Sequence, residues 1–253
     1  MVHQKSHNKI ASIPNPLGNT DVIILCGGEG KRLRSVVSNR PKVLAEVASR
    51  VFLDILVDRL LSYGFRRIIL SVGYMKEEVF KHFDNHPNSK NILFAEEEIP
   101  LGTGGALKNA AQLVKSDDFL VMNGDSFCGA DLSKLYLFHK EKKGVLSIAV
   151  AVAQEPSDYG VVSSNILGQV LSFNEKASVS HGGFVNAGIY FMAKKILGIM
   201  PPQKVFSLEY DFFPEILNHK CFAFDSEAEL IDIGTPERYK LAQKFFSSQP
   251  VKR

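Results

Sequence analysis

The sequence predicts an α/β fold in which helices cover both faces of a mostly parallel sheet. From residue 21 onward, short apolar runs alternate with stretches whose apolar residues follow helical spacing. The first apolar run, residues 22–26, stops at a pair of glycines, as expected of a buried strand that ends at a turn. After residue 145 the pattern changes to strand-like runs with only turns between them. We therefore expect one Rossmann-like domain over residues 21–253, with a small mixed or antiparallel extension.

The first half of this domain is expected to alternate strands and helices. The apolar residues of segment 51–63 follow helical spacing, and Gly64 is a favourable end for that helix. The expected strands are residues 22–26, 67–72, 91–95 and 119–122, and the expected helices are residues 51–63, 76–83 and 105–114.

The second half is expected to be richer in strands, and both chain ends are expected to be loose. The expected strands are residues 145–153, 161–162, 169–173 and 184–192, and the expected helices are residues 209–218 and 236–246. Residues 1–20 contain two prolines and little periodicity, so we expect a flexible arm, and residues 247–253 should fray.

The composition is that of an ordinary globular protein and excludes several classes. Hydrophobic residues make up 45% and charged residues 23% of the 253 residues, which is enough for one large core. The net charge of +3 is too small to indicate nucleic-acid binding, and no apolar run approaches the ~18 residues of a membrane span. Because Cys26, Cys128 and Cys221 are odd in number and far apart, we expect no disulfide framework and a reduced, cytoplasmic setting.

A glycine-rich loop with basic residues, 27–34 (GGEGKRLR), follows the first strand. Glycines let the backbone approach a ligand closely, and successive N–H groups can then bind phosphate oxygens. The dinucleotide fingerprint does not fit, because Leu33 stands where its third glycine belongs. The Walker loop does not fit either, because Arg32 replaces its Ser or Thr. We interpret the loop as a different anion site at the carboxyl end of a strand, where open α/β sheets bind ligands.

Together with Pro41-Lys42, this loop resembles the signature of the sugar-1-phosphate nucleotidyltransferases. Six more motifs follow in the order of that family: 100–106 (PLGTGGA), 123–125 (NGD), 159–160 (YG), 175–176 (EK), 186–190 (NAGIY) and 232–236 (DIGTP). The resemblance covers about residues 21–245. It is most similar to the short guanylyltransferases, which include enzymes acting on D-glycero-α-D-manno-heptose 1-phosphate, with mannose-1-phosphate enzymes close by. No hexapeptide repeat is present, so a left-handed β-helix domain is not expected.

The resemblance implies a reaction that joins a sugar 1-phosphate to GTP, giving a GDP-sugar and pyrophosphate. Such chemistry needs two anions held together and the charge of the transition state neutralised. Arg32 and Lys42 are the implied catalytic residues on the triphosphate. Asp125 and Asp232, each at a strand end, are the implied Mg²⁺ ligands. The implied nucleotide-binding residues are Leu25, Gly27, Gly28, Gly30, Lys31, Glu98, Gly102, Thr103 and Asp125.

Two further residue sets are implied for the base and the sugar. Guanine offers N–H donors, so its site needs an acceptor, and we select Glu98 from the three adjacent glutamates at residues 96–98. An acidic loop edge is the structural alternative for any one of them. The implied sugar-phosphate residues, at the extension, are Gly160, Glu175, Lys176 and Asn186. For residues 175–176 the alternative is a solvated charge pair at a strand end.

Other functions stay open at this point. Mannose 1-phosphate is an alternative sugar, and UTP, CTP or dTTP is an alternative triphosphate on the same fold. A sugar-nucleotide-sensing subunit without activity is a different class, but Arg32, Lys42, Asp125 and Asp232 are all present and argue against it. A glycosyltransferase would need a D-x-D motif after a strand, which the sequence does not supply. A homodimer is an alternative to a monomer.

Overall fold

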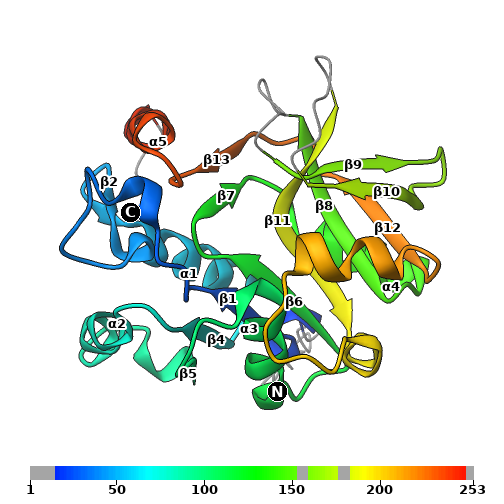
Figure 1. The fold of residues 1–253 in the computed structure, drawn as a ribbon, viewed down its shortest axis with the longest axis horizontal. Helices are drawn as coiled ribbons and strands as arrows, with labels where there is room; N and C mark the ends of the chain where they lie inside the picture. Colours follow the sequence, from blue (N-terminus) through cyan, green and yellow to red (C-terminus); the bar gives the residue numbers. More distant parts are fainter. Residues whose placement is uncertain (1–14, 153–158, 176–182, 249–253) are drawn as a thin grey trace, which may run out of the picture.

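The computed structural model describes residues 15–152, 159–175 and 183–248. Within these ranges, nine strands form one central sheet (Figure 1). The strand order is β10-β9-β11-β6-β1-β4-β5, and β8 pairs with both β11 and β12. This sheet confirms the predicted α/β class.

The parallel part of the sheet contains four strands. They are β1 (Asp21–Leu25), β4 (Arg67–Val72), β5 (Ile92–Glu96) and β6 (Asp118–Asn123), and all pairs among them are parallel. Leu25 lies level with Ser71 on one side and with Asn123 on the other. The carboxyl ends of β1, β4 and β6 therefore meet at one edge, which is the edge where the glycine loop begins.

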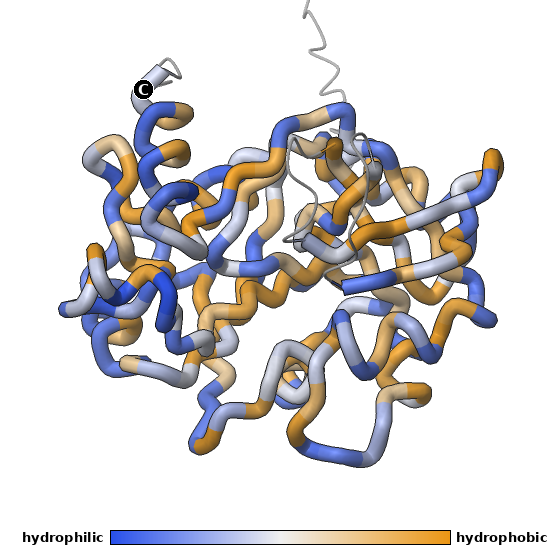
Figure 2. Tube along the Cα trace, turned by 45° about the horizontal axis from the view of Figure 1, so that its top comes forward, coloured by the Kyte–Doolittle hydropathy of each residue, from blue (hydrophilic) through white to orange (hydrophobic). Residues whose placement is uncertain are grey.

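Each face of the sheet has its own hydrophobic core. Val22 and Ile24 point into one core, and Ile23 between them points into the other, as the alternation of a strand requires. The first core is covered by α1 (Phe52–Tyr63), α2 (Lys76–Phe83), α4 (Leu132–Lys142) and α5 (Pro236–Ser248). The second is covered by α3 (Gly102–Ala110) and by short turns after residue 193. Figure 2 shows hydrophobic residues gathered along the central strands and hydrophilic ones on many outer turns.

The remaining strands form the predicted mixed extension. They are β8 (Leu146–Val152), β9 (Val161–Ser164), β10 (Val170–Asn174), β11 (Phe184–Ala193) and β12 (Cys221–Asp225). The long strand β11 is antiparallel to β6 on one side and to β8 on the other, whereas β12 is parallel to β8. Strand β11 thus joins the extension to the parallel half.

Two small strand pairs complete the sheet edge where the glycine loop lies. Strand β7 (Ser126–Cys128) pairs with β13 (Leu230–Asp232), and β2 (Glu46–Val47) pairs with β3 (Arg50–Val51). Helix α5 packs beside the β2–β3 hairpin (Figure 1). Gln243 of this helix donates to Glu46 O at 2.6 Å and accepts from Ala48 N–H at 2.8 Å.

Several element predictions differ from the structure. Segment 209–218 is a π turn (Leu208–Phe212) followed by a 3-10 turn (Pro214–Ile216), because Pro214 has no N–H to continue one helix. Helix α3 begins at Gly102 rather than at residue 105. Helix α4 and strand β12 occupy segments to which the sequence analysis assigned no element.

The predicted N-terminal arm ends earlier than expected. Pro16–Asn19 form a 3-10 turn, Leu17 is only 1% exposed, and Asn15 Nδ2 donates to Tyr63 O at 2.7 Å. The boundary at residue 21 is therefore wrong by several residues, because one apolar side chain anchors this turn under α1. Residues 1–14 and 249–253 lie outside the described ranges, and residues 247–248 belong to α5. No helix in the described ranges is both long and apolar enough to cross a membrane.

Candidate active site

The glycine loop leaves β1 with its backbone donors free. Within the described part of the chain, no hydrogen bond engages the N–H groups of Gly28, Glu29 and Gly30. Gly30 has φ 60°, a left-handed conformation that glycine adopts without strain, and it packs against the Lys42 side chain. Consecutive free N–H groups at a turn form a concave donor surface for an anion. The loop thus has the free donors that the predicted phosphate site requires.

A pocket of about 460 Å³ opens beside this loop at the carboxyl edge of the sheet. Its walls come from the loop, from the ends of β4, β5 and β6, and from the start of α3. Eight residues singled out from the sequence line it: Leu25, Gly27, Gly28, Lys42, Glu98, Gly102, Thr103 and Asp125. The structure therefore brings together segments that lie up to 100 residues apart in the chain.

Lys42 and Asp125 meet on one wall of the pocket. The Lys42 ammonium forms an ion pair with Asp125 Oδ2, and the two side chains are 14% and 36% exposed. Burial raises the pKa of the Asp125 carboxyl, but Lys42, and to a smaller degree Arg32, outweigh it and hold the pKa below its ordinary value. Asp125 is accordingly a carboxylate surrounded by cations, as a site for phosphate and metal requires.

Asp232 lies next to Asp125 through the pairing of β13 with β7. Asp232 is level with Ser126, and the following N–H, of Ile233, donates to Asp125 O at 3.0 Å. The carboxylate of Asp232 accepts from Gly234 N–H at 2.8 Å and from the Tyr159 hydroxyl, and it pairs with Arg238 at 3.1 Å. Two carboxylates on adjacent strand ends are the hard oxygen donors that Mg²⁺ prefers, so the donor set fits such an ion.

Arg32 lies near Gly234, which follows β13, and near enough to Asp125 to affect it. A methyl group on Gly234 would lie 3.6 Å from the Arg32 guanidinium, and this guanidinium contributes to the low pKa of Asp125. Lys31 lies elsewhere: its side chain is 76% exposed, it pairs with Glu29 at 3.2 Å, and it does not line the pocket. Arg32 is exposed as well and lies outside the pocket lining, but its charge acts on Asp125.

The Gly102-Thr103 turn is fixed by the segment before the π turn. Gly102 has φ 71°, and a methyl group there would lie 2.6 Å from Phe206 O. Thr103 Oγ1 donates to Glu209 at 2.6 Å and accepts from Leu208 N–H at 2.9 Å. This turn therefore presents its backbone, rather than the threonine hydroxyl, to the pocket.

Glu97 is the main pocket residue that the sequence analysis did not select. It is 8% exposed and lines the pocket, whereas Glu98 is exposed at the rim. Its carboxyl accepts from Ser71 Oγ and from Leu101 N–H, both at 3.2 Å, and burial raises its pKa. A methyl group on Gly27 would lie 2.5 Å from Glu97 Oε1, so this glycine is needed for the two to pack. Three adjacent glutamates gave no sequence signal to choose among them.

Asn123, at the end of β6, is a second pocket residue that the sequence analysis did not assign to the site. Its Oδ1 atom is buried without a hydrogen-bond partner in the described part of the chain. A buried acceptor without a partner is costly, so this oxygen is suited to a donor on a bound ligand.

Three of the four predicted sugar residues lie together in the extension. A methyl group on Gly160 would lie 2.5 Å from Glu175 Oε2, and Gly160 O accepts from Asn186 N–H at 2.7 Å. The Asn186 side chain is mostly engaged in hydrogen bonds within the protein. It donates to the Tyr190 hydroxyl at 2.7 Å and accepts from Gly188 N–H at 3.0 Å. Lys176 lies outside the described residues.

A doubly covered sheet with free loop N–H groups, cations and two carboxylates at its carboxyl edge is the arrangement expected of a nucleotide-binding transferase. A family model described as nucleotidyl transferase matches residues 21–249. The chain therefore belongs to the nucleotidyl transferase family.

Relatives and solved structures agree with this assignment. The chain is 38% identical over 225 residues to D-glycero-alpha-D-manno-heptose 1-phosphate guanylyltransferase from Aneurinibacillus thermoaerophilus, covering 88% of this chain and 97% of the relative. It is 36% identical over 217 residues to the Campylobacter jejuni enzyme of the same name, covering 86% and 96%. The crystal structure of HddC from Yersinia pseudotuberculosis complexed with GMP-PN superposes with a TM-score of 0.78 at 36% identity, covering 90% of this chain and 99% of that one.

Proposed function

We propose that this protein is a guanylyltransferase that joins D-glycero-α-D-manno-heptose 1-phosphate to GTP, releasing pyrophosphate. The observation that carries the proposal is the pocket at the sheet edge, where free loop N–H groups, Lys42 and Asp125 face one cavity. The relatives whose names state this activity match this chain over nearly their whole length. Mannose 1-phosphate is the alternative sugar. Free, buried cysteines accord with a reduced, cytoplasmic setting.

In the proposed reaction, the pocket residues bind the phosphates and neutralise their negative charge. The N–H groups of Gly28, Glu29 and Gly30 bind phosphate oxygens, and Arg32 and Lys42 neutralise charge that develops on the triphosphate. To do so, Lys42 leaves its ion pair with Asp125. Asp125 and Asp232 would hold Mg²⁺, which when bound stabilises negative charge on the reacting phosphates.

The sugar phosphate approaches from the extension. Gly160, Glu175 and Lys176 would bind the sugar and its phosphate, with Glu175 accepting from ring hydroxyls. Asn186 would act mainly by shaping this wall, because most of its amide is engaged with Tyr190 and Gly188. Alignment of the two bound anions then supplies most of the rate enhancement, since the chemistry needs no covalent intermediate with the protein.

Guanine recognition is assigned to Glu97 rather than to Glu98. An ionised carboxylate only accepts hydrogen bonds, and each of its oxygens can accept two. Each oxygen of Glu97 uses one position within the protein, which leaves an acceptor for N1–H and another for the amino group of guanine. Uracil, thymine and cytosine do not carry this pair of adjacent donors.

The first test is pyrophosphate release in the presence of Mg²⁺. GTP, UTP, CTP, ATP and dTTP are each paired with heptose, mannose and glucose 1-phosphates. Release with GTP and the heptose phosphate is expected. Release with another triphosphate would contradict the guanine assignment but keep the class of reaction. Binding of a nucleotide-sugar without release in any pairing would favour the sensing subunit instead.

Glu97→Gln tests the base assignment directly. The amide keeps the size of the side chain but replaces one acceptor by a donor, so kcat/KM for GTP should fall by about tenfold to a hundredfold, since a hydrogen bond to a charged group contributes ~1.5–3 kcal/mol. Glu98→Gln is the matched control and should leave kcat/KM within about twofold, as surface substitutions usually do. Equal effects of the two substitutions would contradict the assignment.

A further inference from the structure

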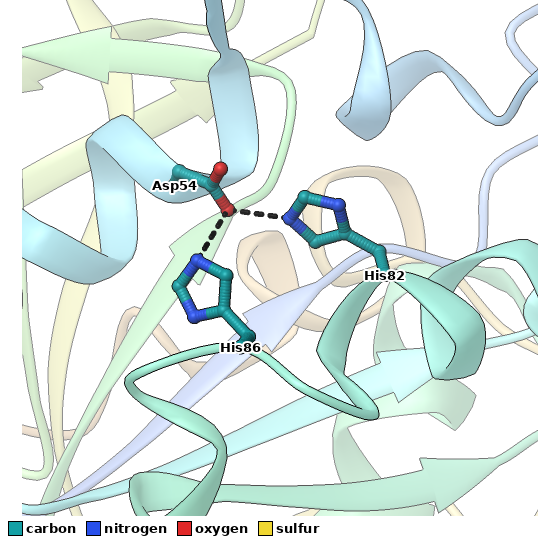
Figure 3. Close-up of side chains that lie close together, drawn as sticks. All are labelled: Asp54, His82 and His86. Carbon is teal, nitrogen blue, oxygen red and sulfur yellow. Dashed lines mark hydrogen bonds and ion pairs between the residues drawn. The ribbon is translucent and has the colours of Figure 1, made fainter.

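Three side chains with metal-binding chemistry converge away from the nucleotide pocket (Figure 3). Asp54 lies in the first turn of α1, His82 in the last turn of α2, and His86 in the turn that follows α2. His82 Nε2 lies 2.7 Å and His86 Nε2 lies 3.6 Å from the same atom, Asp54 Oδ1. Figure 3 shows both imidazole rings directed at this one carboxylate.

The spacing of these atoms suits a small divalent ion. All three ligand atoms lie within 4.8 Å of one another. Bonds of about 2.0–2.2 Å in a tetrahedral site place ligand atoms ~3.4 Å apart. The 3.6 Å between His86 and Asp54 is already close to this value, and the 2.7 Å between His82 and Asp54 would have to lengthen by about 0.7 Å. Asp54 belongs to α1, His82 to α2 and His86 to the turn after α2, so the site would tie α1 to α2.

The side chains are also accessible enough for an ion to enter. Those of His82, His86 and Asp54 are 21%, 16% and 20% exposed. This exposure leaves room for water to complete the coordination. Nitrogen ligands from two histidines favour borderline ions such as Zn²⁺, whereas Mg²⁺ prefers oxygen ligands alone.

The tautomer of His86 affects how the metal ion can bind and offers a way to detect binding. His86 Nδ1 now accepts from Asn88 N–H at 3.2 Å, which places the proton of the neutral ring on Nε2. Metal binding through Nε2 requires the proton on Nδ1 instead, so loading breaks this hydrogen bond. At 3.2 Å it lies at the long end of the range, and it belongs to a turn rather than to a helix or strand. The Asn88 amide is therefore expected to respond to the ion.

We propose that Asp54, His82 and His86 form a binding site for a Zn²⁺-class transition-metal ion, separate from the nucleotide pocket. The site does not depend on the proposed catalytic function, because it shares no residue with the pocket.

Calorimetric titration with ZnCl₂ tests the site in the full chain after treatment with a chelator. Mg²⁺ is present throughout, so that oxygen-only sites are filled. All samples carry His3→Gln and His7→Gln, because these histidines could bind Zn²⁺ on their own. One site per chain is expected, and His82→Gln or His86→Gln should weaken it at least tenfold. His219→Gln, at an exposed histidine in the other half of the chain, is the control and should leave the affinity unchanged.

Two further readouts separate loss of the site from loss of the fold. Without metal, the His82→Gln and His86→Gln variants should unfold cooperatively, and only the protein with all three ligands should gain in Tm when Zn²⁺ is added. In ¹⁵N-resolved spectra, Zn²⁺ should shift the Asn88 amide resonance and move the His86 proton to Nδ1. Equal Zn²⁺ affinity in the parent and both variants, or an unchanged Asn88 amide in the loaded protein, would overturn the proposal.

Discussion

Each of the two carboxylates proposed to hold Mg²⁺ is paired with a cation of the protein. Lys42 pairs with Asp125, and Arg238 pairs with Asp232 while its guanidinium stacks 4.4 Å from the centre of the Tyr159 ring. These contacts keep two nearby negative charges balanced before any ligand binds. The arrangement also means that the protein's own cations compete with the metal ion for the same oxygens.

Arg238→Gln should expose this competition, if the proposed metal role of Asp232 holds. Removing the cation should lower the Mg²⁺ concentration needed for half-maximal pyrophosphate release by about fivefold, the equivalent of ~1 kcal/mol for a partly exposed pair. Lys244→Gln removes the same charge from an exposed position on α5 and should have no such effect. The measurement is a Mg²⁺ titration of initial rates, with Mn²⁺ binding followed by electron paramagnetic resonance as a check without turnover. A higher Mg²⁺ requirement in Arg238→Gln would contradict the competition.

Asp21 should be a main source of stability at neutral pH. Burial raises the pKa of its carboxyl, but hydrogen bonds from Ser116 N–H, the Arg67 guanidinium and Lys115 N–H outweigh burial and leave the pKa below its ordinary value. A depressed pKa stabilises the folded state above the unfolded value of about 3.9, and this stability is lost as the pH falls through the folded pKa.

Asp21→Asn should therefore lower the free energy of unfolding by about 2 kcal/mol at pH 7 and by less near pH 3. Urea unfolding at both pH values measures this. Asp58→Asn is the control, because Asp58 pairs with Arg50 at the surface and should change stability by no more than about 0.5 kcal/mol. An equal loss at both pH values would show that packing, rather than charge, explains the effect.

At the residue scale, the sequence motifs identified residues of the pocket, but they could not decide between adjacent residues of the same type. Lys42 and Asp125 were selected by motif, and the structure places them in contact. Glu97 could not be separated from Glu98, because only the bend after β5 decides which glutamate turns into the pocket. Tyr159 and Arg238 were missed as partners of Asp232, since residues so far apart in sequence give no local signal for an ion pair.

At the scale of elements, α3 shows how glycine permits close packing. A methyl group on Gly105 would overlap Lys204 O and approach Leu101 Cβ to 2.9 Å, and one on Gly104 would overlap the Phe206 ring. Gly102, Gly104 and Gly105 of this helix thus lie directly against the segment before the π turn. The family motif at 100–106 consequently has a structural role as well as a proposed role in binding the base.

Gly105→Ala should destabilise the protein although alanine favours helices. Displacing the Lys204 segment should cost about 1–3 kcal/mol, which exceeds the ~1 kcal/mol gained in helix propensity. Gly198→Ala is the matched control, because a methyl group there meets nothing within 4 Å. Thermal unfolding of both variants gives the comparison, and an unchanged or higher Tm for Gly105→Ala would show that the segment yields easily.

Elements with strong local periodicity were predicted well, and those that depend on distant partners were not. The bounds of β4 and α2 match the prediction, because both have clear patterns and clear ends. Strand β12 has no alternation to mark it and is defined by its pairing with β8. Helix α4 did carry a signal, since Asp131 caps it and Leu132, Leu135 and His139 form its buried side. That pattern was overlooked rather than absent.

At the scale of the whole molecule, the fold buries all three cysteines, although Cys26 also borders the pocket. Cys26, Cys128 and Cys221 are all buried and none forms a disulfide. Burial raises the pKa of the Cys221 thiol to about 12 and that of Cys26 well above its ordinary value. Thiol reagents need access to the sulfur and react with the thiolate, so burial protects all three residues, and the raised pKa adds to the protection of Cys26 and Cys221.

The native protein should therefore resist Ellman's reagent at pH 7 and release three thiols per chain once it is unfolded in guanidinium chloride. The absorbance of the released thiolate, followed with and without denaturant, measures this. Reaction of one thiol in the native protein within minutes would show that the sheet edge beside Cys26 opens readily.

The contacts between α5 and the β2–β3 hairpin also bear on how the molecule is made. The ribosome synthesises the glycine loop, Lys42 and Asp125 early. Asp232 and helix α5, which contacts Glu46 and Ala48, are synthesised only after the whole extension. A nascent chain can assemble its parallel strands while still tethered, yet it still lacks Asp232, the second carboxylate proposed to hold Mg²⁺. The order of translation therefore sets the order of assembly. The proposed metal site is complete only when nearly every other described element has been synthesised.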